Sequence, residues 1–408
     1  NFNIKIEQKK EFNDTKYDGT IHNIEEYAEI LKNADYELLP HQLFVRNFMS
    51  FQTPYNSLLL FHGLGSGKTC GGIGVCEEMR DYLKQMGINK RIIIVASPNV
   101  QDNFKLQLFD ERKLVKNGET WDLNTCVGNN LMNEINPTEI KNIPKERVIS
   151  QVNSIINNYY SFVGYTELAN FIKKKIDITA YSDYSKEKKK QILVRKIQKV
   201  FNNRLIIIDE AHNIRPTDDN QDKKKTANLL MTVCKHALNT RLVLLSATPL
   251  YNNYKEIVWL TNLMNVNDNR STIVSSDIFD KDGNILDSGR ELLQRKLTGY
   301  ISFVRGENPY TFPYRIYPSV FSPEKALDTE NYPTKQMNNQ DITIPIQHLP
   351  LYMNNIGDYQ KSGYNMVISF LRERTNTVTT KYGKIRELPS FENMESFGYS
   401  YLEKPLQI

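Results

Sequence analysis

A run of apolar residues that breaks into alternating glycines and ends in Gly-Lys-Thr constrains this chain more than any other feature. Residues 58–61 are Leu-Leu-Leu-Phe, and residues 62–69 are His-Gly-Leu-Gly-Ser-Gly-Lys-Thr. Glycine permits positive φ and close backbone approach, so successive N–H groups can turn inward around a phosphate where the next helix begins. The pattern predicts a phosphate-binding loop between a buried strand at 57–61 and a helix at 70–86.

The residues of this loop have predicted roles in holding ATP and Mg²⁺. Lys68 would reach the β- and γ-phosphates, and the Thr69 hydroxyl would ligate Mg²⁺. The predicted nucleotide-binding residues of the loop are Gly63, Gly65, Ser66, Gly67, Lys68 and Thr69. His62 stands where the strict pattern G-x-x-x-x-G-K-S/T has glycine, and we expect the neighbouring glycines to compensate. A glycine-rich turn without a ligand is the alternative interpretation.

An acidic pair directly follows the apolar residues 205–208, in the order Asp209-Glu210-Ala211-His212. At the carboxyl end of a parallel strand, Asp209 can hold Mg²⁺ through water, so the predicted metal residues are Thr69 and Asp209. Glu210 can polarise the water that attacks the γ-phosphate. The predicted catalytic residues are Lys68, Asp209 and Glu210. An acidic turn after a core strand is the alternative, but it does not account for His212.

A third polar loop, Ser246-Ala247-Thr248, follows the apolar residues 241–245. Its hydroxyls could hydrogen-bond the acidic pair or His212 and so sense the nucleotide state. The predicted coupling residues are therefore His212, Ser246 and Thr248. Open α/β sheets bind ligands at the carboxyl ends of their strands. Three such loops in this order predict a nucleotide-hydrolysing site.

Gln42 lies 26 positions before Lys68, within an apolar pattern of helical spacing at residues 38–49 whose Pro40 suits a helix start. A side-chain amide presents both a donor and an acceptor, which reading the N6/N7 edge of adenine requires. A lone glutamine on a helix is usually a surface residue. The prediction that Gln42 binds the base therefore depends on the phosphate loop.

Apolar strands alternate with amphipathic helices along much of the chain. Residues 91–96 and 159–165 provide two more strands, and helical patterns follow each of them. Such alternation predicts βαβ units and a parallel sheet, so the fold class is α/β.

Composition limits the classes of protein to which this chain can belong. Its 408 residues are 40% hydrophobic and 24% charged, as is typical of a soluble globular protein, and its apolar runs are too short to span a membrane. The first residues show no signal peptide, so we expect a cytoplasmic protein. The four cysteines lack C-x-x-C spacing, which argues against a zinc site or a disulfide framework and favours a reducing compartment.

Positive charge is concentrated in one segment. Residues 171–199 contain ten Lys or Arg and three acids, a net charge of +7, whereas the whole chain carries +5 and the remainder therefore −2. A solvated lysine-rich helix face is one interpretation. The other is a surface that contacts a phosphate backbone, with Lys173, Lys174, Lys175, Lys188, Lys189 and Lys190 as the predicted nucleic-acid-binding residues.

With these residues in view, the chain resembles the superfamily 2 helicases and translocases. Gly63 to Thr69 is similar to motif I, Ser97-Pro98 lies in a motif Ia context, residues 209–212 form a DEAH box, and residues 246–248 resemble motif III. Gln42 falls where the family has its adenine-reading glutamine.

A narrower resemblance is to the Swi/Snf-type branch and, within it, to the helicase-like ATPases of large cytoplasmic DNA viruses. That group includes the early transcription factor small subunit and nucleoside triphosphate phosphohydrolase I of poxviruses. The branch resemblance rests on residues 249–264, and the viral resemblance on residues 299–309, on Phe312-Pro313-Tyr314-Arg315 and on Tyr317-Pro318.

The resemblance implies a domain organisation. Residues 1–37 are expected to form an N-terminal extension, and residues 38–265 a RecA-like ATPase lobe with the basic insertion near 171–199. Residues 266–345 would be an extension and linker, and residues 346–408 the start of an incomplete second lobe. No Q-x-x-G-R-x-x-R-like motif VI occurs in the 408 residues.

The implied function is an ATP-dependent translocase or helicase on DNA or RNA that serves viral-type transcription. A viral-type RNA polymerase or a transcription factor subunit would be its partner, in a viral factory or virion if the protein is viral. The alternative is a non-catalytic nucleic-acid-binding transcription subunit that keeps the ATPase fold as a scaffold. Intact Lys68, Thr69, Asp209 and Glu210 argue against that alternative, because a scaffold does not need them.

Overall fold

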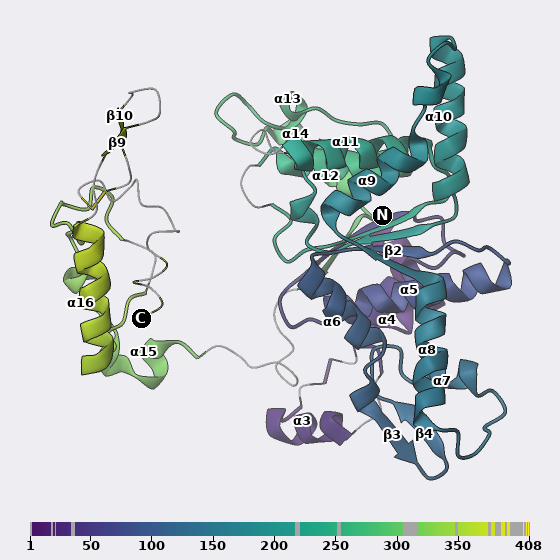
Figure 1. The fold of residues 1–408 in the computed structure, drawn as a ribbon, viewed down its shortest axis with the longest axis horizontal. Coiled ribbons are helices and arrows are strands. Elements are labelled where there is room, and N and C mark those ends of the chain that lie inside the picture. The colour runs from purple at the N-terminus through teal and green to yellow at the C-terminus, as the bar shows by residue number, and fades with distance from the viewer. Residues whose placement is uncertain are drawn as a thin grey trace. The chain divides into compact units, whose positions relative to one another are not determined.

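The computed structural model describes most of the chain, and the described residues form two compact units, 1–313 and 314–408 (Figure 1). The described residues are 2–17, 19–20, 22–33, 37–216, 221–250, 254–304, 316–346, 350–373, 377–379, 385–387, 390–391, 403, 405 and 407. Residues 305–315, which contribute to the viral resemblance, lie outside this set.

Unit 1 contains a central sheet, helices on both of its faces, and a small separate hairpin. Its strands are β1 (Ser57–His62), β2 (Ile92–Val95), β3 (Leu114–Asn117), β4 (Thr120–Leu123), β5 (Tyr160–Val163), β6 (Leu205–Ile208), β7 (Arg241–Leu245) and β8 (Ile301–Val304). Its longer helices are α3 (Ile24–Asn33), α4 (Pro40–Phe48), α5 (Lys68–Gln85), α6 (Pro98–Leu108), α8 (Lys145–Tyr159), α9 (Tyr165–Ile176), α10 (Lys186–Phe201), α11 (Gln221–His236), α12 (Glu256–Asn267) and α14 (Asp287–Leu297). Its shorter helices are α1 (Phe2–Glu7), α2 (Lys10–Asn13), α7 (Asn130–Ile135) and α13 (Ser275–Ile278), with 3-10 turns η1 (Glu111–Lys113), η2 (Thr179–Tyr181) and η3 (Ala211–Asn213).

The central sheet has six strands in the order β5-β2-β6-β7-β1-β8, and every neighbouring pair is parallel. The α/β fold class with a parallel sheet is therefore confirmed. The predicted strands in the five segments between residues 57 and 245 correspond to β1, β2, β5, β6 and β7. Within the described part of the chain, no helix is both long and apolar enough to cross a membrane.

Both faces of this sheet are buried, because alternate residues of each strand pack against different layers of helices. In β6, Leu205 and Ile207 pack with residues of α4, α5, α6 and α8. Ile206 and Ile208 pack with residues of α9, α10, α11 and α12. Figure 1 shows the two layers on opposite sides of the strands. Double-sided burial explains why these strands are continuously apolar in sequence.

The sheet extends past residue 265, where the sequence placed the end of the ATPase lobe. β8 pairs in parallel with β1, in a register that sets Leu60 opposite Ser302. The predicted boundary is wrong because strand pairing joins residues about 240 positions apart, which no local pattern reveals. The N-terminal segment also belongs to this body, since Phe12 of α2 packs against Phe44 and Phe48 of α4.

Unit 2 is smaller and carries no parallel sheet among its described residues. Its helices are α15 (Pro318–Phe321) and α16 (Asp358–Arg372), with 3-10 turns η4 (Pro323–Lys325) and η5 (Thr329–Asn331). Strands β9 (Thr377–Thr379) and β10 (Ile385–Glu387) form an antiparallel pair. Ile368 and Leu371 of α16 are the centre of a small apolar cluster.

The structure contains a disulfide between Cys70 and Cys126, whereas Cys76 and Cys234 are free and buried. The sequence interpretation against a disulfide framework is therefore wrong for one pair. The fold brings the first turn of α5 against the loop after β4, with a Cα–Cα distance of 5.3 Å, although 56 positions separate the two cysteines. Cysteine spacing consequently gives no support for a reducing compartment.

Reduction of this disulfide should destabilise unit 1. A cross-link across 56 positions restricts the unfolded chain, and the chain-entropy model assigns such a loop about 4 kcal/mol. Urea unfolding with and without dithiothreitol measures the difference. The double variant Cys70→Ser/Cys126→Ser should unfold at the same urea concentration in both conditions. Equal midpoints for the wild type in both conditions would contradict the prediction.

Candidate active site

The phosphate loop lies between β1 and α5, as the sequence predicts. Gly65 and Gly67 have φ of 73° and 74°, the left-handed region that glycine adopts without strain. A Cβ atom on Gly67 would lie 2.3 Å from Gln42 Nε2, so a side chain at this position would also collide with α4. α5 begins at Lys68, and its first N–H groups are therefore free of helix partners and available to an anion.

The Lys68 ammonium group folds back onto the loop. Its Nζ donates to His62 O at 2.9 Å and to Gly63 O at 3.4 Å. Burial lowers the pKa of Lys68, while the carboxylates of Glu210 and Asp209 act in the opposite direction. The loop lysine and the acidic pair therefore share one electrostatic environment, even though about 140 positions separate them in the sequence.

His62, which replaces the usual first glycine of the motif, has its side chain against β8. Its side chain is 1% exposed, and Nε2 lies 2.9 Å from Ser302 Oγ on β8. Burial, with the charges of His41 and Lys68, lowers the pKa of His62 to about 3. A neutral imidazole packed against β8 explains how the chain accommodates this departure.

The acidic pair lies just past β6. Asp209 is only 9% exposed, and burial, helped by the charge of Glu210, raises its pKa to about 6. Glu210 N donates to Asp209 Oδ1 at 3.0 Å. Glu210 has φ 45° and ψ 59°, a left-handed conformation that costs a non-glycine residue free energy and is common at functional sites.

His212 connects the acidic pair to the third loop. Its Nδ1 lies 3.2 Å from Glu210 Oε2 and 3.5 Å from Ser246 Oγ. Ser246 is fully buried, and its hydroxyl oxygen accepts from Thr248 N at 3.1 Å. Thr248 enters this chain of contacts through its backbone N–H, and its side chain is exposed. Of the predicted hydroxyl contacts, the structure therefore contains the one between Ser246 and His212, whereas Thr248 reaches Ser246 only through its backbone.

Gln42 is a buried residue that fixes the phosphate loop. Its Oε1 accepts from Leu39 N at 2.9 Å, and its Nε2 donates to Gly67 O at 3.0 Å. An amide has two N–H donors and two acceptor lone pairs, so one of each remains for a base. The adenine-reading role of Gln42 stays a prediction, next to a loop-positioning role that the structure adds.

Several site residues escaped sequence reasoning. Tyr165 Oη donates to Asp209 O at 3.0 Å and accepts from Asn213 Nδ2 at 3.3 Å. Arg215 pairs with Glu256, with Nε 2.6 Å from Oε1 and both side chains buried. Tyr165 follows the carboxyl end of β5, so its position at a strand end was the signal that could have identified it.

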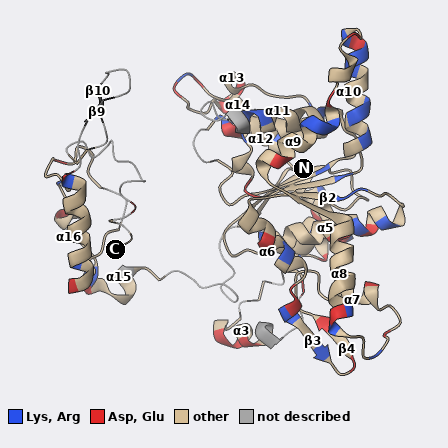
Figure 2. Ribbon diagram, in the orientation of Figure 1, with Lys and Arg blue, Asp and Glu red and all other residues tan. Residues whose placement is uncertain are grey.

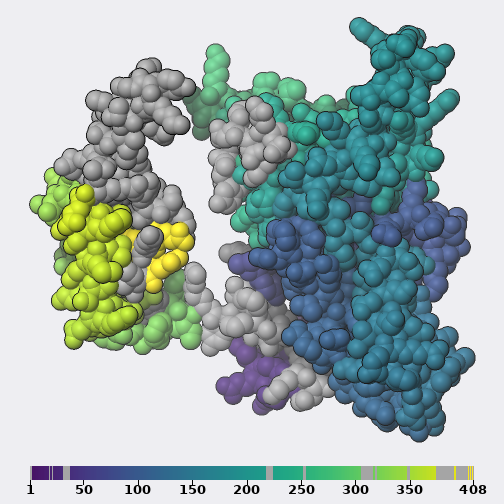
Figure 3. All heavy atoms as spheres, viewed as in Figure 1, coloured from purple at the N-terminus to yellow at the C-terminus, as the bar shows by residue number. Residues whose placement is uncertain are grey.

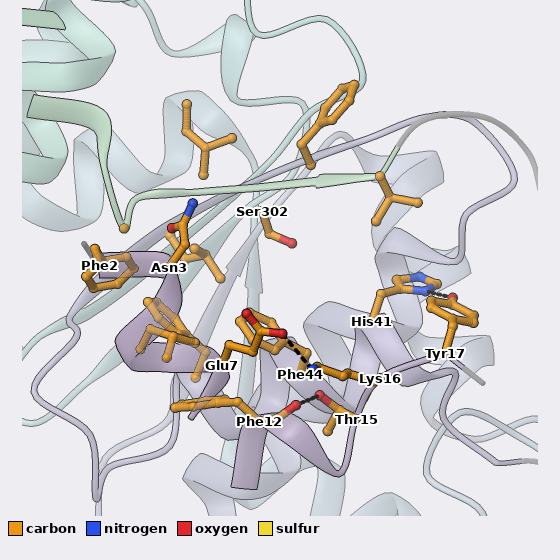
Figure 4. Close-up of a pocket in the computed structure, with 17 residues that line it drawn as sticks. Phe2, Asn3, Glu7, Phe12, Thr15, Lys16, Tyr17, His41, Phe44 and Ser302 are labelled. Atoms are coloured by element: carbon orange, nitrogen blue, oxygen red, sulfur yellow. Dashed lines mark hydrogen bonds and ion pairs between the residues drawn. The ribbon is translucent and has the colours of Figure 1, made fainter. Parts of the chain in front are cut away.

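A cavity of about 520 Å³ lies between the N-terminal segment, α4 and β8 (Figure 4). α1, α2, α4 and β8 supply its walls. His41 connects it to the loop, because Nε2 lies 2.8 Å from Ser66 O while Nδ1 lies 2.6 Å from Tyr17 Oη. Figure 4 shows Tyr17 and His41 side by side at one end of the cavity. Tyr17, which follows α2, is therefore linked to the phosphate loop through His41.

The donor set fits a Mg²⁺ ion that is held mainly by phosphates and water. No cluster of three or more His, Cys, Asp or Glu side chains suited to a metal occurs among the described residues. Mg²⁺ in phosphate-transfer sites needs only one or two protein oxygens, because waters and substrate phosphates supply the rest. Asp209 and the Thr69 hydroxyl are oxygen donors of that kind.

The predicted nucleic-acid-binding lysines are not part of this site. Lys173, Lys174 and Lys175 lie in the last turn of α9, and Lys188, Lys189 and Lys190 lie in the first turns of α10. Both groups are distant from the loops that follow β1, β6 and β7. Their role is therefore a separate question from nucleotide chemistry.

Comparison with known proteins gives a consistent picture. A family model described as the SNF2-related domain matches residues 41–302. A protein named as an ATP-dependent RNA helicase in Acanthamoeba polyphaga mimivirus is 29% identical over 73% of this chain and 25% of its own length. The early transcription factor 70 kDa subunit of Melanoplus sanguinipes entomopoxvirus is 24% identical over 72% of this chain and 37% of its own. The chain thus spans well under half of either relative.

A solved structure, the Sulfolobus solfataricus SWI2/SNF2 ATPase core in complex with dsDNA, aligns with 67% of this chain and 45% of its own. The sequence identity is 15% and the TM-score is 0.37, too low to support an argument about function.

The raised pKa of Asp209 predicts a pH-dependent stability difference. Its folded value of about 6 exceeds the ordinary 3.8, so the stability present below pH 4 is lost as pH rises through 6. Without nucleotide or Mg²⁺, Asp209→Asn should therefore be more stable than wild type at pH 8, by up to about 3 kcal/mol, and similar near pH 4. Urea unfolding at both pH values measures this, with the exposed Asp282→Asn as control. A difference independent of pH would contradict it.

Proposed function

The chain belongs to the SNF2-related domain family, and on that premise we propose that it is the nucleotide-hydrolysing lobe of an ATP-dependent nucleic-acid translocase or helicase. Hydrolysis would be coupled to movement on DNA or RNA. The observation that supports this most is the convergence of three loops, after β1, β6 and β7, whose polar side chains share one partly buried environment. Lys68, Asp209 and Glu210 have the chemistry for phosphoryl transfer to water.

Each residue has a distinct part in the proposed reaction. The loop N–H groups and Lys68 bind the phosphates, and Lys68 exchanges its bonds to His62 O and Gly63 O for phosphate oxygens. Asp209 and Thr69 would hold Mg²⁺, which neutralises charge on the β- and γ-phosphates when bound. Glu210 orients and polarises the attacking water.

The third loop gives the site a means of sensing hydrolysis. Glu210 contacts His212, and His212 contacts Ser246 at the end of β7. A change in the position or charge of Glu210 during the reaction would therefore alter the contacts of His212. We infer that His212, Ser246 and Thr248 couple the nucleotide state to the rest of the motor.

The setting proposed for this activity is viral-type transcription in the cytoplasm. One matched relative is named as an RNA helicase and another as an early transcription factor subunit, both from viruses. A viral-type RNA polymerase or transcription factor subunit is the partner that these names favour. ATPase stimulation by DNA and by RNA, measured with a partner that supplies the missing arginine, decides on which nucleic acid the protein moves.

Substitution of the two central residues tests the chemistry. Glu210→Gln should retain ATP binding and lose most hydrolysis, because the amide cannot activate the water. Lys68→Ala should instead weaken nucleotide binding itself. Fluorescent-nucleotide binding and phosphate release measure the two effects. If Glu210→Gln turns over ATP as fast as wild type, Glu210 has no such role. A wild type that hydrolyses no ATP even with a partner that supplies the missing arginine supports the scaffold alternative.

A second prediction concerns what the 408 residues do alone. In this family the second lobe supplies an arginine that stabilises the transferring phosphoryl group, and such an arginine contributes on the order of 10³ to 10⁵ in rate. Because the 408 residues contain no motif VI, we expect weak Mg·ATP binding, very slow hydrolysis and little stimulation by nucleic acid. Addition of a partner that carries the arginine should raise the rate.

Steady-state phosphate release by the purified chain, with and without nucleic acid, measures this second prediction. Several turnovers per second under nucleic-acid stimulation would contradict it. In that case another arginine must reach the γ-phosphate, and Arg305 and Arg315, which lie outside the described residues, are the first to substitute.

A further inference from the structure

Residues 173–199 form a basic spur, which comprises the end of α9, the turn η2 and most of α10. Its ten Lys and Arg residues exceed its three acids by seven charges, although the whole chain carries only +5. Figures 1 and 2 show α10 extending away from the sheet with Lys and Arg along it. The space-filling view shows the same helix projecting beyond its neighbours (Figure 3).

The spur lies at the amino edge of the sheet, opposite the nucleotide site. α9 starts at the carboxyl edge, where Tyr165 Oη donates to Asp209 O. Six residues further along α9, the Phe171 ring contacts the Arg204 guanidinium, whose Cζ lies 5.6 Å from the ring centroid. Arg204 immediately precedes β6 and so marks the amino edge of the sheet. The twelve residues of α9 therefore cross the sheet from one edge to the other, a length of about 18 Å at 1.5 Å per residue.

Contacts of α10 confirm this placement. Phe201 O, at its C-terminal end, accepts from Thr240 Oγ1 at 2.9 Å, and Thr240 directly precedes β7. Burial lowers the pKa of His236 at the end of α11, and the charges of Lys235 and Lys190 add to that effect. The cations of the spur consequently belong to a surface that is separate from the loops that carry the acidic pair.

This positive charge is not neutralised within the described protein. No ion pair links a cation of the spur to a carboxylate among the described residues. Lys196 Nζ instead donates to Asp177 O and lies 5.1 Å from the Tyr181 ring centroid. The adjoining amino edge adds more cations, since Lys90 donates to Asn202 O and Arg204 to Arg91 O. Burial and the charge of Arg91 lower the pKa of Arg204 to about 10.

The outer part of α10 has little packing of its own. Ile197 and Phe201, in its last two turns, are the buried residues among its sixteen. Lys186, Lys188 and Lys190 are exposed. Tyr184 beside them is 46% exposed, with Lys188 Nζ 5.2 Å from its ring centroid. Lysines beside an exposed tyrosine, with the half-buried Tyr181 nearby, suit a phosphate backbone and the faces of unpaired bases.

We propose that the basic spur is an accessory nucleic-acid-binding surface that contacts phosphates outside the nucleotide-hydrolysing edge. The choice of nucleic acid as the partner rests on the proposed function, and the surplus of unpaired cations supports it. Because the spur is remote from Lys68 and Glu210, it should hold the nucleic acid in every nucleotide state. Its loss should weaken binding without changing hydrolysis in the absence of nucleic acid.

The test compares two triple variants that remove the same charge. Lys188→Gln/Lys189→Gln/Lys190→Gln alters the spur, and glutamine retains the helix propensity of lysine. Lys113→Gln/Lys116→Gln/Lys141→Gln, in and near the β3–β4 hairpin, is the matched control at exposed positions. Binding of a duplex DNA, of one of its strands and of the matching RNA is measured from low to moderate salt, without nucleotide. Circular dichroism checks that both variants fold.

The spur variant should bind the favoured nucleic acid more weakly, and its slope of log K against log salt should be shallower. For duplex DNA each lost contact flattens the slope by ~0.9, so three contacts flatten it by about 2.7. The control variant should keep the wild-type slope. An unchanged slope in the spur variant, or an equal change in both variants, would overturn the proposal.

Two further readouts separate this proposal from its alternatives. If polyglutamate competes as well as nucleic acid at equal charge, the spur is a general anion surface suited to an acidic protein, and the proposal fails. If Glu210→Gln hydrolyses ATP at the wild-type rate but the spur variant has a shallower slope of log K against log salt, the proposed function fails. The proposal that the spur binds nucleic acid is then still supported. If hydrolysis is lost in Glu210→Gln and the spur variant keeps its slope, the spur proposal alone fails.

Discussion

Burial of the parallel sheet on both faces is the constraint on which the rest of unit 1 depends. Each residue of β6, from Leu205 to Ile208, is fully buried, and the interiors of the neighbouring strands β1, β2 and β7 are likewise apolar. In these four strands polar side chains occur only at the strand ends or just beyond them. At the carboxyl edge the loops lead into helices whose first N–H groups lack partners, which favours anions there. The position of the active site thus follows from the layers above and below the sheet.

Partial burial then determines the electrostatics of that edge. Desolvation raises the pKa of Asp209 and lowers the pKa of Lys68, while the charges of Glu210 and Asp209 oppose the shift of Lys68 and the charge of Lys68 opposes that of Asp209. His62 differs from both, because burial above all, with the charges of His41 and Lys68, lowers its pKa to about 3 and leaves it neutral. An incoming Mg·ATP adds both signs of charge to this environment.

The sequence predicted those features that local patterns determine. The phosphate loop, the strands before Asp209 and Ser246, and the helix after Gly67 all have signals within a few residues. The strand β8 had none, because Ile301 to Val304 becomes part of the sheet only through pairing with β1. The same holds for Cys70 and Cys126, whose proximity depends on how α5 meets the loop after β4.

Long-range geometry also decided what the site residues do. Gln42 was predicted to bind the base because it lies 26 positions before Lys68 in the sequence. Its contact with Gly67 O could not be predicted in this way, because it forms only when the fold brings α4 against the loop. Tyr165 had no motif at all, and its bond to Asp209 O arises because β5 and β6 are both adjacent to β2. Sequence spacing identified the chemistry of the site, whereas packing identified the residues that hold it in place.

The same packing keeps the carboxyl edge of the sheet, which carries Asp209 and Glu210, apart from the amino edge, which carries the basic spur. α9 begins beside Asp209 and ends in Lys173, Lys174 and Lys175, and Leu168 and Ile172 fix it against the sheet. Its length of about 18 Å corresponds to roughly five base-pair steps at 3.4 Å each. A phosphate backbone bound at the spur is therefore too far away to take part in the chemistry at Glu210. An influence of one edge on the other can pass along α9, which is packed against the sheet between them.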